Sequence, residues 1–247
     1  MGDVLAGNNA VWDFEPEAVV IRYSRGVWGS RLLQALGERR VPHGALEDVE
    51  LVEGRRGTVV LRAVPRPGAD PVVEAADGQL KESADPYRLV LPAQSRTLAE
   101  TSRDKLLAAI GAAGGGAGQE PPGRFLVTAP GVPRSFKAYD AKASFDGREV
   151  GFRWFWTGAT TAKWKAGDQT FPVEELSGVQ WRSPDQGHGH LRLLRRDAAG
   201  SGSVPLTEEA DQDPAAVVFG LGYGPVHESL PFAAAVLAAI RAVRVRP

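Results

Sequence analysis

The chain of 247 residues contains one internal repeat of its own sequence pattern at a nearly constant offset. The stretch 42–49, Pro-His-Gly-Ala-Leu-Glu-Asp-Val, returns at 172–179 as Pro-Val-Glu-Glu-Leu-Ser-Gly-Val, an offset of 130. Leu-Ala-Ala-Ile returns at the same offset near the end of each half. Such spacing over separated segments indicates a duplication, with a period too long for a solenoid repeat and suited to a small domain. Further matches, at offsets of 128 to 131, pair Phe14 with Phe145, Val19 with Val150, Ile21 with Phe152, Tyr23 with Trp154, Leu61 with Leu191 and Asp85 with Asp213.

The duplication predicts two tandem domains with a linker between them. The linker, 112–123, is rich in glycine and ends in Pro-Pro-Gly, so we expect it to be flexible at first and stiffer toward its end. The predicted organisation is a first repeat over 1–111, the linker, and a second repeat over 124–247.

Composition is typical of a globular protein, with 43% hydrophobic and 24% charged residues. Basic and acidic residues number 14 and 16 in 1–115, and 15 and 14 in 116–247, so neither half carries the basic excess of a nucleic-acid binder. The chain has no cysteine, which excludes disulfides, thiolate nucleophiles and cysteine-ligated zinc.

The sequence gives no sign of a membrane protein. The N-terminal residues lack the basic and apolar regions of a signal peptide. The longest apolar run, 232–240, has nine residues, about half of what a bilayer span requires. We therefore expect a cytoplasmic protein. Arginine outnumbers lysine 23 to 6, which hints at a GC-rich bacterial genome.

Each copy has the pattern of short strands followed by one helix. The helix of the first copy is expected to begin at Thr97, with Glu100 completing a capping box, and to end at Gly111. The last helix is expected over 229–243, with Ser229 as its cap. The expected strands are 11–14, 18–23, one within 32–41, 49–52, 58–64, 72–75 and 87–91 in the first copy, and 143–145, 149–156, 179–182, 189–195 and 216–219 in the second.

Several short motifs, in their order and spacing, resemble the actinobacterial "domain of unknown function 4429" family. The resemblance covers nearly the whole chain and implies a bacterial pleckstrin-homology-like fold. The implied class is α+β, mainly β: two tandem pleckstrin-homology-like domains, each a strongly bent antiparallel sheet of about six to seven strands plugged by one C-terminal helix. The family implies no activity and no catalytic residue. The motifs are Pro-x-x-x-Leu-x-x-Val in both copies, Gln-Ala-Leu-Gly-Glu at 34–38, Ala-Asp-Pro-Tyr-Arg-Leu at 84–89, Ser-Phe-Asp-Gly at 144–147 and the Trp-x-Trp pair at 154–156.

An aromatic and basic cluster in the second copy is the strongest candidate for a contact surface. Trp154 shares strand parity with Val150 and Phe152, so we expect it in the core. Trp156 and Trp164 lie at or beyond the strand end, where tryptophan beside lysine suits a protein contact. The candidate partner-binding residues are Trp156, Trp164, Lys163 and Lys165, together with Trp28 and Arg31 of the first copy.

Other motifs do not assemble an active site. The glycine-rich stretch 220–224 lacks a surrounding βαβ unit and is expected to be a connecting loop. His188 and His190 lack a third metal ligand nearby. Ser229 lies outside a Gly-x-Ser-x-Gly motif. We therefore predict no catalytic residues, no metal, no cofactor and no enzymatic activity.

Three functions remain after these exclusions. The leading hypothesis is a non-enzymatic cytoplasmic module that binds an unknown protein or peptide and no nucleic acid. The alternative is a peripheral contact with anionic lipid headgroups through the loops 25–31 and 163–165. The third is a small-ligand carrier or enzyme with a site between the domains.

Overall fold

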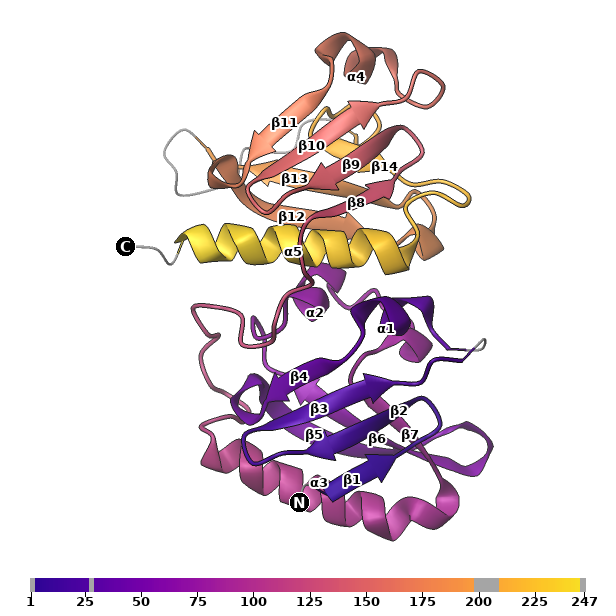
Figure 1. Cartoon of the computed structure of the whole chain (residues 1–247), viewed down its shortest axis with the longest axis vertical. Helices are drawn as coiled ribbons and strands as arrows, with labels where there is room; N and C mark the ends of the chain where they lie inside the picture. Colours follow the sequence, from indigo (N-terminus) through magenta and orange to yellow (C-terminus); the bar gives the residue numbers. More distant parts are fainter. Residues whose placement is uncertain (1–2, 27–28, 198–208, 245–247) are drawn as a thin grey trace. The chain divides into compact units, whose positions relative to one another are not determined.

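The computed structural model describes residues 3–26, 29–197 and 209–244. It is mainly β, with four small antiparallel sheets and a long helix closing each repeat (Figure 1). The elements of the first repeat are β1 (Asp3–Ala6), β2 (Ala10–Phe14), β3 (Ala18–Tyr23), α1 (Arg31–Leu36), β4 (Arg39–Pro42), η1 (His43–Ala45), β5 (Leu46–Glu53), η2 (Arg55–Gly57), β6 (Thr58–Pro65), α2 (Pro71–Ala76), η3 (Glu82–Ala84), β7 (Arg88–Pro92), η4 (Ala93–Ser95) and α3 (Arg96–Ala112). Those of the second are β8 (Arg134–Lys137), β9 (Ala141–Phe145), β10 (Glu149–Trp154), α4 (Thr161–Ala166), β11 (Gln169–Pro172), η5 (Val173–Glu175), β12 (Leu176–Arg182), η6 (Pro184–Gln186), β13 (His190–Arg195), β14 (Ala216–Val218) and α5 (Val226–Arg244).

The two repeats place their strands in the same order. The first has the sheets β1-β2-β3-β4 and β5-β6-β7, and the second has the matching sheets β8 to β11 and β12-β13-β14. A register shift occurs at the same place in both, between Leu46 and Asp48 and between Leu176 and Gly178. The tandem duplication is thereby confirmed. We expected one bent sheet in each repeat, but a 3₁₀ turn redirects the chain between its four-stranded and three-stranded sheets.

In the second four-stranded sheet, successive side chains alternate between the core and the solvent. In β9, Ala141, Ala143 and Phe145 are buried, whereas Lys142 and Ser144 are exposed. The same alternation buries the apolar residues of β10, including Trp154 at 5% exposure, so its expected core position is confirmed. One face of this sheet packs into the core and the other meets solvent.

Two stretches expected as strands contain helices. Within 32–41 the chain forms α1 and then β4, because Gly37 takes a positive φ of 67° and ends the helix. Residues 71–76 form α2, since Pro71 is suited to a first helical turn and buries an apolar face with Val72. The prediction of a strand at 72–75 was wrong. The strand expected within 32–41 is β4, but the helix α1 that precedes it was not predicted.

The closing helices begin earlier than their sequences predicted. The 3₁₀ turn η4 runs directly into α3 at Arg96, and no side chain caps that end, so the capping box is absent. Gly111 lies inside α3, and the first positive φ after the helix is at Gly114. α5 begins at Val226, which places Ser229 inside the helix as a fully buried residue.

α5 has the length and apolar composition of a membrane-spanning helix, but half of its apolar window is buried inside the protein. It packs against β12, β8 and α2 (Figure 1). These contacts give it the position of a core helix.

The chain forms two compact units whose limits differ from those of the sequence repeat. Unit 1 comprises 1–70 and 81–128, and unit 2 comprises 71–80 and 129–247. The segment 71–80 comes from the first repeat but packs in unit 2, where Gln79 donates to the carbonyl of Trp181 and accepts from the amide of Ser183. The two units are defined by contacts within the structure. The repeat boundaries at 1–111 and 124–247 come from the sequence and remain a prediction.

The expected linker 112–123 makes hydrogen bonds within unit 1. The amide of Gly116 donates to the carbonyl of Leu46, and Arg66 donates to the carbonyl of Glu120. Gly115 approaches the backbone so closely that an added Cβ would lie 2.7 Å from the Leu46 oxygen. Glycine in this stretch therefore permits packing as well as bending.

Candidate interaction surface

Two tryptophans of unit 2 lie together on its surface, as their positions beyond β10 suggested. Trp156 follows the end of β10 and Trp164 lies on α4, and they are 75% and 47% exposed. Their ring centroids are 5.1 Å apart and the ring planes meet at 81°, an edge-to-face contact. Such pairs contribute about 0.5–1.5 kcal/mol beyond the area that they bury. We call this the tryptophan pair.

Lys163, expected on the contact surface, is buried in unit 2. Its side chain has no exposed area, its Nζ donates to Oδ2 of Asp140 at 2.6 Å, and it lies 5.1 Å from the centre of the Trp154 ring. The six-residue helix α4 directs this residue inward, while its neighbours Trp164 and Lys165 remain outside. Lys163 therefore anchors α4 and is not available to a partner.

The acid that holds Lys163 also bonds to a neighbouring strand. The Oδ1 atom of Asp140 accepts a hydrogen bond from the amide of Val218 in β14, at 3.0 Å. Burial of the pair outweighs their mutual attraction: it lowers the pKa of Lys163 and raises the pKa of Asp140. Through this pair α4 is tied to the body of unit 2, so the tryptophan pair has a firm support.

The three other predicted contact residues differ in where the structure places them. Arg31 is exposed at the start of α1 in unit 1. Trp28 lies outside the described residues. Lys165 is exposed on α4, next in sequence to Trp164. The described surface in unit 2 thus keeps three of the six predicted residues.

Sequence reasoning missed a second aromatic group in unit 2. The Nζ of Lys137 lies 5.4 Å from the ring centres of both Phe155 and Tyr223. Tyr139 meets Tyr223 edge to face, with centroids 6.0 Å apart. These residues come from three separate segments, so their proximity has no signal in linear spacing.

The glycine-rich loop 220–224 connects β14 to α5, as expected. Gly224 has a φ of 64°, and an added Cβ would lie 2.2 Å from the ring of Phe219. The loop brings Tyr223 beside Lys137, so its glycines have a steric role.

Ser229 has a structural role in place of the cap that we predicted. Its hydroxyl accepts from Nε1 of Trp181 at 3.0 Å and lies within 3.1 Å of the carbonyl oxygens of Gly224 and Pro225. A hydroxyl held in this way satisfies a buried indole and the start of α5.

Within 3–26, 29–197 and 209–244, no cluster of three or more histidine, aspartate or glutamate side chains is able to hold a metal ion. His190 is partly buried, which lowers its pKa, and its ring nitrogens face the carbonyl of His188 and the amide oxygen of Gln180.

The fold defines a tandem-repeat protein of two mainly-β repeats. A family model described as "Domain of unknown function (DUF4429)" matches residues 12–107 and 143–237, and the chain belongs to that family. The two matches coincide with the two structural repeats, which confirms the family resemblance. A search of the curated proteins finds no match to this chain.

Proposed function

We propose that the chain is a non-enzymatic cytoplasmic interaction protein that binds a protein or peptide through the tryptophan pair of its second repeat. The proposal includes a pleckstrin-homology-like fold for each repeat and an actinobacterial origin. The observation that supports it best is the exposure of Trp156 and Trp164, at 75% and 47%.

The exposed parts of the two rings do not contribute to the core of unit 2. Tryptophan is among the residues most enriched at binding hot spots, where a large rigid ring fills a pocket of the partner. The edge-to-face contact and the support of α4 by Lys163 hold the rings in place before binding. Such preorganisation reduces the entropy lost on association.

Binding to anionic lipid is the alternative function, and its basis is narrower than the sequence suggested. Lys163 is buried and cannot reach a headgroup. Lys165 in unit 2, and Arg25 and Arg31 in unit 1, remain exposed. Salt-sensitive flotation with phosphatidylserine vesicles, unchanged by loss of the tryptophan pair, would favour lipid over protein.

The test of the leading proposal is affinity capture from the native host with a Trp156→Ala, Trp164→Ala double variant. We expect the partner to be lost, because each hot-spot tryptophan contributes about 2 kcal/mol or more, roughly thirtyfold in affinity. The matched control is Leu98→Ala with Val52→Ala, which removes exposed apolar side chains from unit 1. Retention of every partner by the tryptophan variant, with normal folding, would overturn the proposal.

A further inference from the structure

Three cations form a line across the solvent face of the four-stranded sheet in unit 2. Arg153 of β10 lies directly opposite Lys142 of β9, and Lys142 lies directly opposite Lys137 of β8. All three residues are exposed. Neighbouring strands are about 4.8 Å apart, so the backbone positions of the three residues follow one another at about that spacing. We call these residues the basic row.

The basic row is unfavourable for the sheet that contains it. Like charges directly opposite each other on adjacent strands destabilise a sheet. Among the described residues, 3–26, 29–197 and 209–244, none of the three forms an ion pair with a carboxylate. Lys137 has only aromatic rings as its charge partners, those of Phe155 and Tyr223.

Unit 1 forms the same sheet without this arrangement. Its residues equivalent to Lys137 and Lys142 are Ala6 and Val11. Its one cation in the row, Arg22, is bonded to Asp13 and Glu38. The fold therefore does not require three unneutralised cations side by side.

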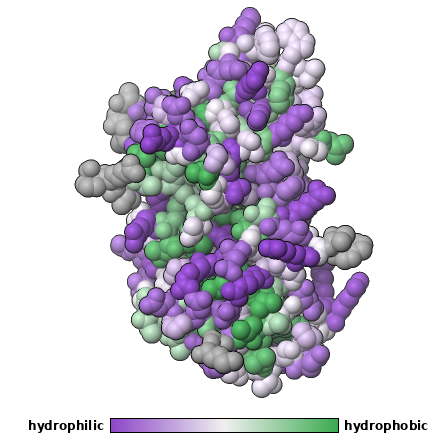
Figure 2. Space-filling model, in the orientation of Figure 1, coloured by the Kyte–Doolittle hydropathy of each residue, from purple (hydrophilic) through white to green (hydrophobic). Residues whose placement is uncertain are grey.

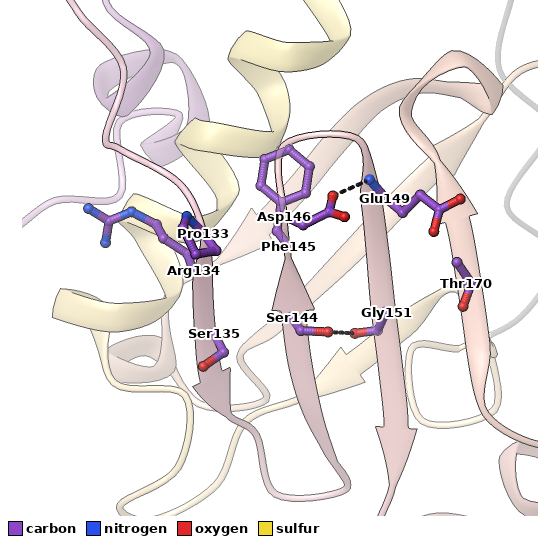
Figure 3. Close-up of a pocket in the computed structure, with 9 residues that line it drawn as sticks. All are labelled: Pro133, Arg134, Ser135, Ser144, Phe145, Asp146, Glu149, Gly151 and Thr170. Atoms are coloured by element: carbon purple, nitrogen blue, oxygen red, sulfur yellow. Dashed lines mark hydrogen bonds between the residues drawn. The ribbon is translucent and has the colours of Figure 1, made fainter.

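Beside the basic row, the same sheet face forms a groove. Its volume is about 430 Å³, and short side chains line its floor in one line across all four strands (Figure 3). Figure 2 shows this face mainly in the hydrophilic and intermediate colours. The floor residues are Ser135, Ser144, Gly151 and Thr170.

The groove depends on small side chains at these positions. A Cβ added to Gly151 would lie 2.9 Å from the Oγ of Ser144, so glycine keeps the floor low. In unit 1 the equivalent line carries the larger residues Val4, Asp13, Val20 and Arg40. The depression thus belongs to the second repeat.

Along β10 the face changes character in a fixed order. Glu149, Gly151 and Arg153 point outward, and Phe155 continues the same parity beyond the strand. The steps between them are about 6.6–6.8 Å, the repeat of an extended chain. The face runs from acid through hydroxyls to base and then to aromatic residues, ending beside Trp156. A uniform polyanion would meet Asp146 and Glu149 at the acidic end, whereas a peptide of mixed character would not be repelled.

We propose that this groove and the basic row bind an acidic peptide segment of the partner, with its carboxylates on Lys137, Lys142 and Arg153 and an apolar residue against the tryptophan pair. The inference rests on the proposed function and names the chemistry of the partner. Its basis is charge complementarity, since carboxylates would neutralise the three like charges that the free sheet holds side by side.

The test is selection of random peptides displayed on phage against the immobilised full chain. We expect the selected peptides to be enriched in aspartate and glutamate followed by an apolar residue. A Lys142→Glu, Arg153→Glu variant should lose affinity for them by about a hundredfold, because each reversed contact changes affinity by roughly tenfold. The matched control is Arg182→Glu with Arg195→Glu, exposed cations on the other sheet of unit 2.

A stability measurement distinguishes a basic row that binds acidic peptides from one that only faces solvent. Because Lys142 has a like charge on each side, Lys142→Gln should raise the melting temperature by about 1–3 °C while it weakens acidic peptides about tenfold. Failure to select peptides, selection of neutral or basic peptides, or equal affinity in the reversed variant would overturn the inference. Tighter binding of oligo-dT than of acidic peptides, lost in the reversed variant, would overturn it in favour of nucleic acid.

The tryptophan double variant distinguishes failure of this inference from failure of the proposed function. Selected peptides that need Trp156 and Trp164 but ignore charge reversal would leave the proposed function standing and overturn the acidic-peptide assignment. If native partners survive loss of the tryptophans, the proposed function fails whatever the peptides show.

Discussion

At one equivalent position, the two repeats use different side chains to bond the backbone of the last strand. In the first, Asn9 accepts from the amide of Val90 at 2.8 Å and donates to the carbonyl of Arg88. In the second, Asp140 accepts from the amide of Val218 at 3.0 Å. Each residue satisfies the last strand of its repeat. The difference lies in charge, because an amide is neutral and a carboxylate is not.

A second position differs together with the first. Leu33, 4% exposed on α1, corresponds to Lys163, fully buried on α4. A carboxylate cannot be buried cheaply without a partner, and a lysine cannot replace a core leucine without an acid. The first repeat combines an asparagine with a leucine at these two positions, and the second combines an aspartate with a lysine. We infer that a repeat with one residue from each combination would be less stable.

The outer residues near this position differ as well. By the same offsets, Trp156 and Trp164 correspond to Arg25 and Gln34. Gln34 donates from its side chain to the carbonyl of Gly26, so the first repeat uses this position for its own loop. The second repeat exposes two aromatic rings there.

The largest expected effect comes from mixing the two combinations. Lys163→Leu should destabilise unit 2 by about 3–5 kcal/mol, because it leaves the Asp140 carboxylate buried without its cation. Adding Asp140→Asn should recover most of that loss or exceed it, since buried pairs are often replaced by neutral groups at no cost. Urea denaturation of the four members of the cycle measures both.

One result of this double-mutant cycle would contradict the comparison. If Asp140→Asn with Lys163→Leu is as unstable as the sum of its single variants, the two positions are independent and the comparison is wrong. Leu98→Ala in unit 1 is a suitable control for a substitution outside the pair.

In unit 1, the buried carboxylate of Asp70 is held by hydrogen bonds, and removing one of them should have a somewhat smaller effect on stability. Asp70 accepts from Arg39 at 2.9 Å and from the hydroxyl of Tyr87 at 2.6 Å. Tyr87→Phe removes a charge-assisted hydrogen bond and should cost about 1.5–3 kcal/mol. Hydrogen exchange resolved along the chain should show the loss in unit 1. An unchanged exchange rate there would mean that Arg39 suffices.

His43 should make unit 1 sensitive to acid, an effect that the residue at the equivalent position of unit 2 does not have. Burial lowers the pKa of His43, so the folded state favours the neutral ring. As the pH falls below about 6.5, the unfolded chain takes up a proton that the folded chain resists, and stability is lost. The second repeat has Val173 at this position. His43→Val should therefore reduce the loss of stability of unit 1 between about pH 7.5 and 5.

Hydrogen exchange of unit 1 at the two pH values, corrected for intrinsic exchange, measures this effect. His190 in unit 2 also has a pKa lowered by burial, so unit 2 keeps its own acid sensitivity and serves as the internal reference. Equal sensitivity of unit 1 with and without His43 would show that other groups carry it.

The smallest expected effect on stability is at the proposed contact surface. Exchanging the tryptophan pair for the residues of the first repeat, Trp156→Arg with Trp164→Gln, should lower the free energy of unfolding by about 0.5–1.5 kcal/mol, the contribution of one edge-to-face aromatic pair. Both rings are largely outside the core. Partner binding should nevertheless be lost. A destabilisation of several kcal/mol would instead assign the pair a structural role.

The duplication, the strands of the three-stranded sheet in each repeat and the core position of Trp154 could be predicted from the sequence. They could be predicted because the repeat period and strand parity can be read directly along the chain. The exposed positions of Trp156 and Trp164 did not follow from parity, which would place Trp156 on the buried face with Trp154; they were expected because both residues lie at or beyond the strand end. Local patterns also misled, as at 72–75, where apolar residues after a proline formed a helix packed in unit 2.

Only the tertiary structure decided which charges face the core and which face solvent. Lys163 and Lys165 are two residues apart and equally polar in sequence, yet one is buried on Asp140 and the other is exposed. The basic row joins Lys137, Lys142 and Arg153 from three strands through register. Burial and strand register depend on contacts between distant segments, and local sequence carries no record of which segments meet.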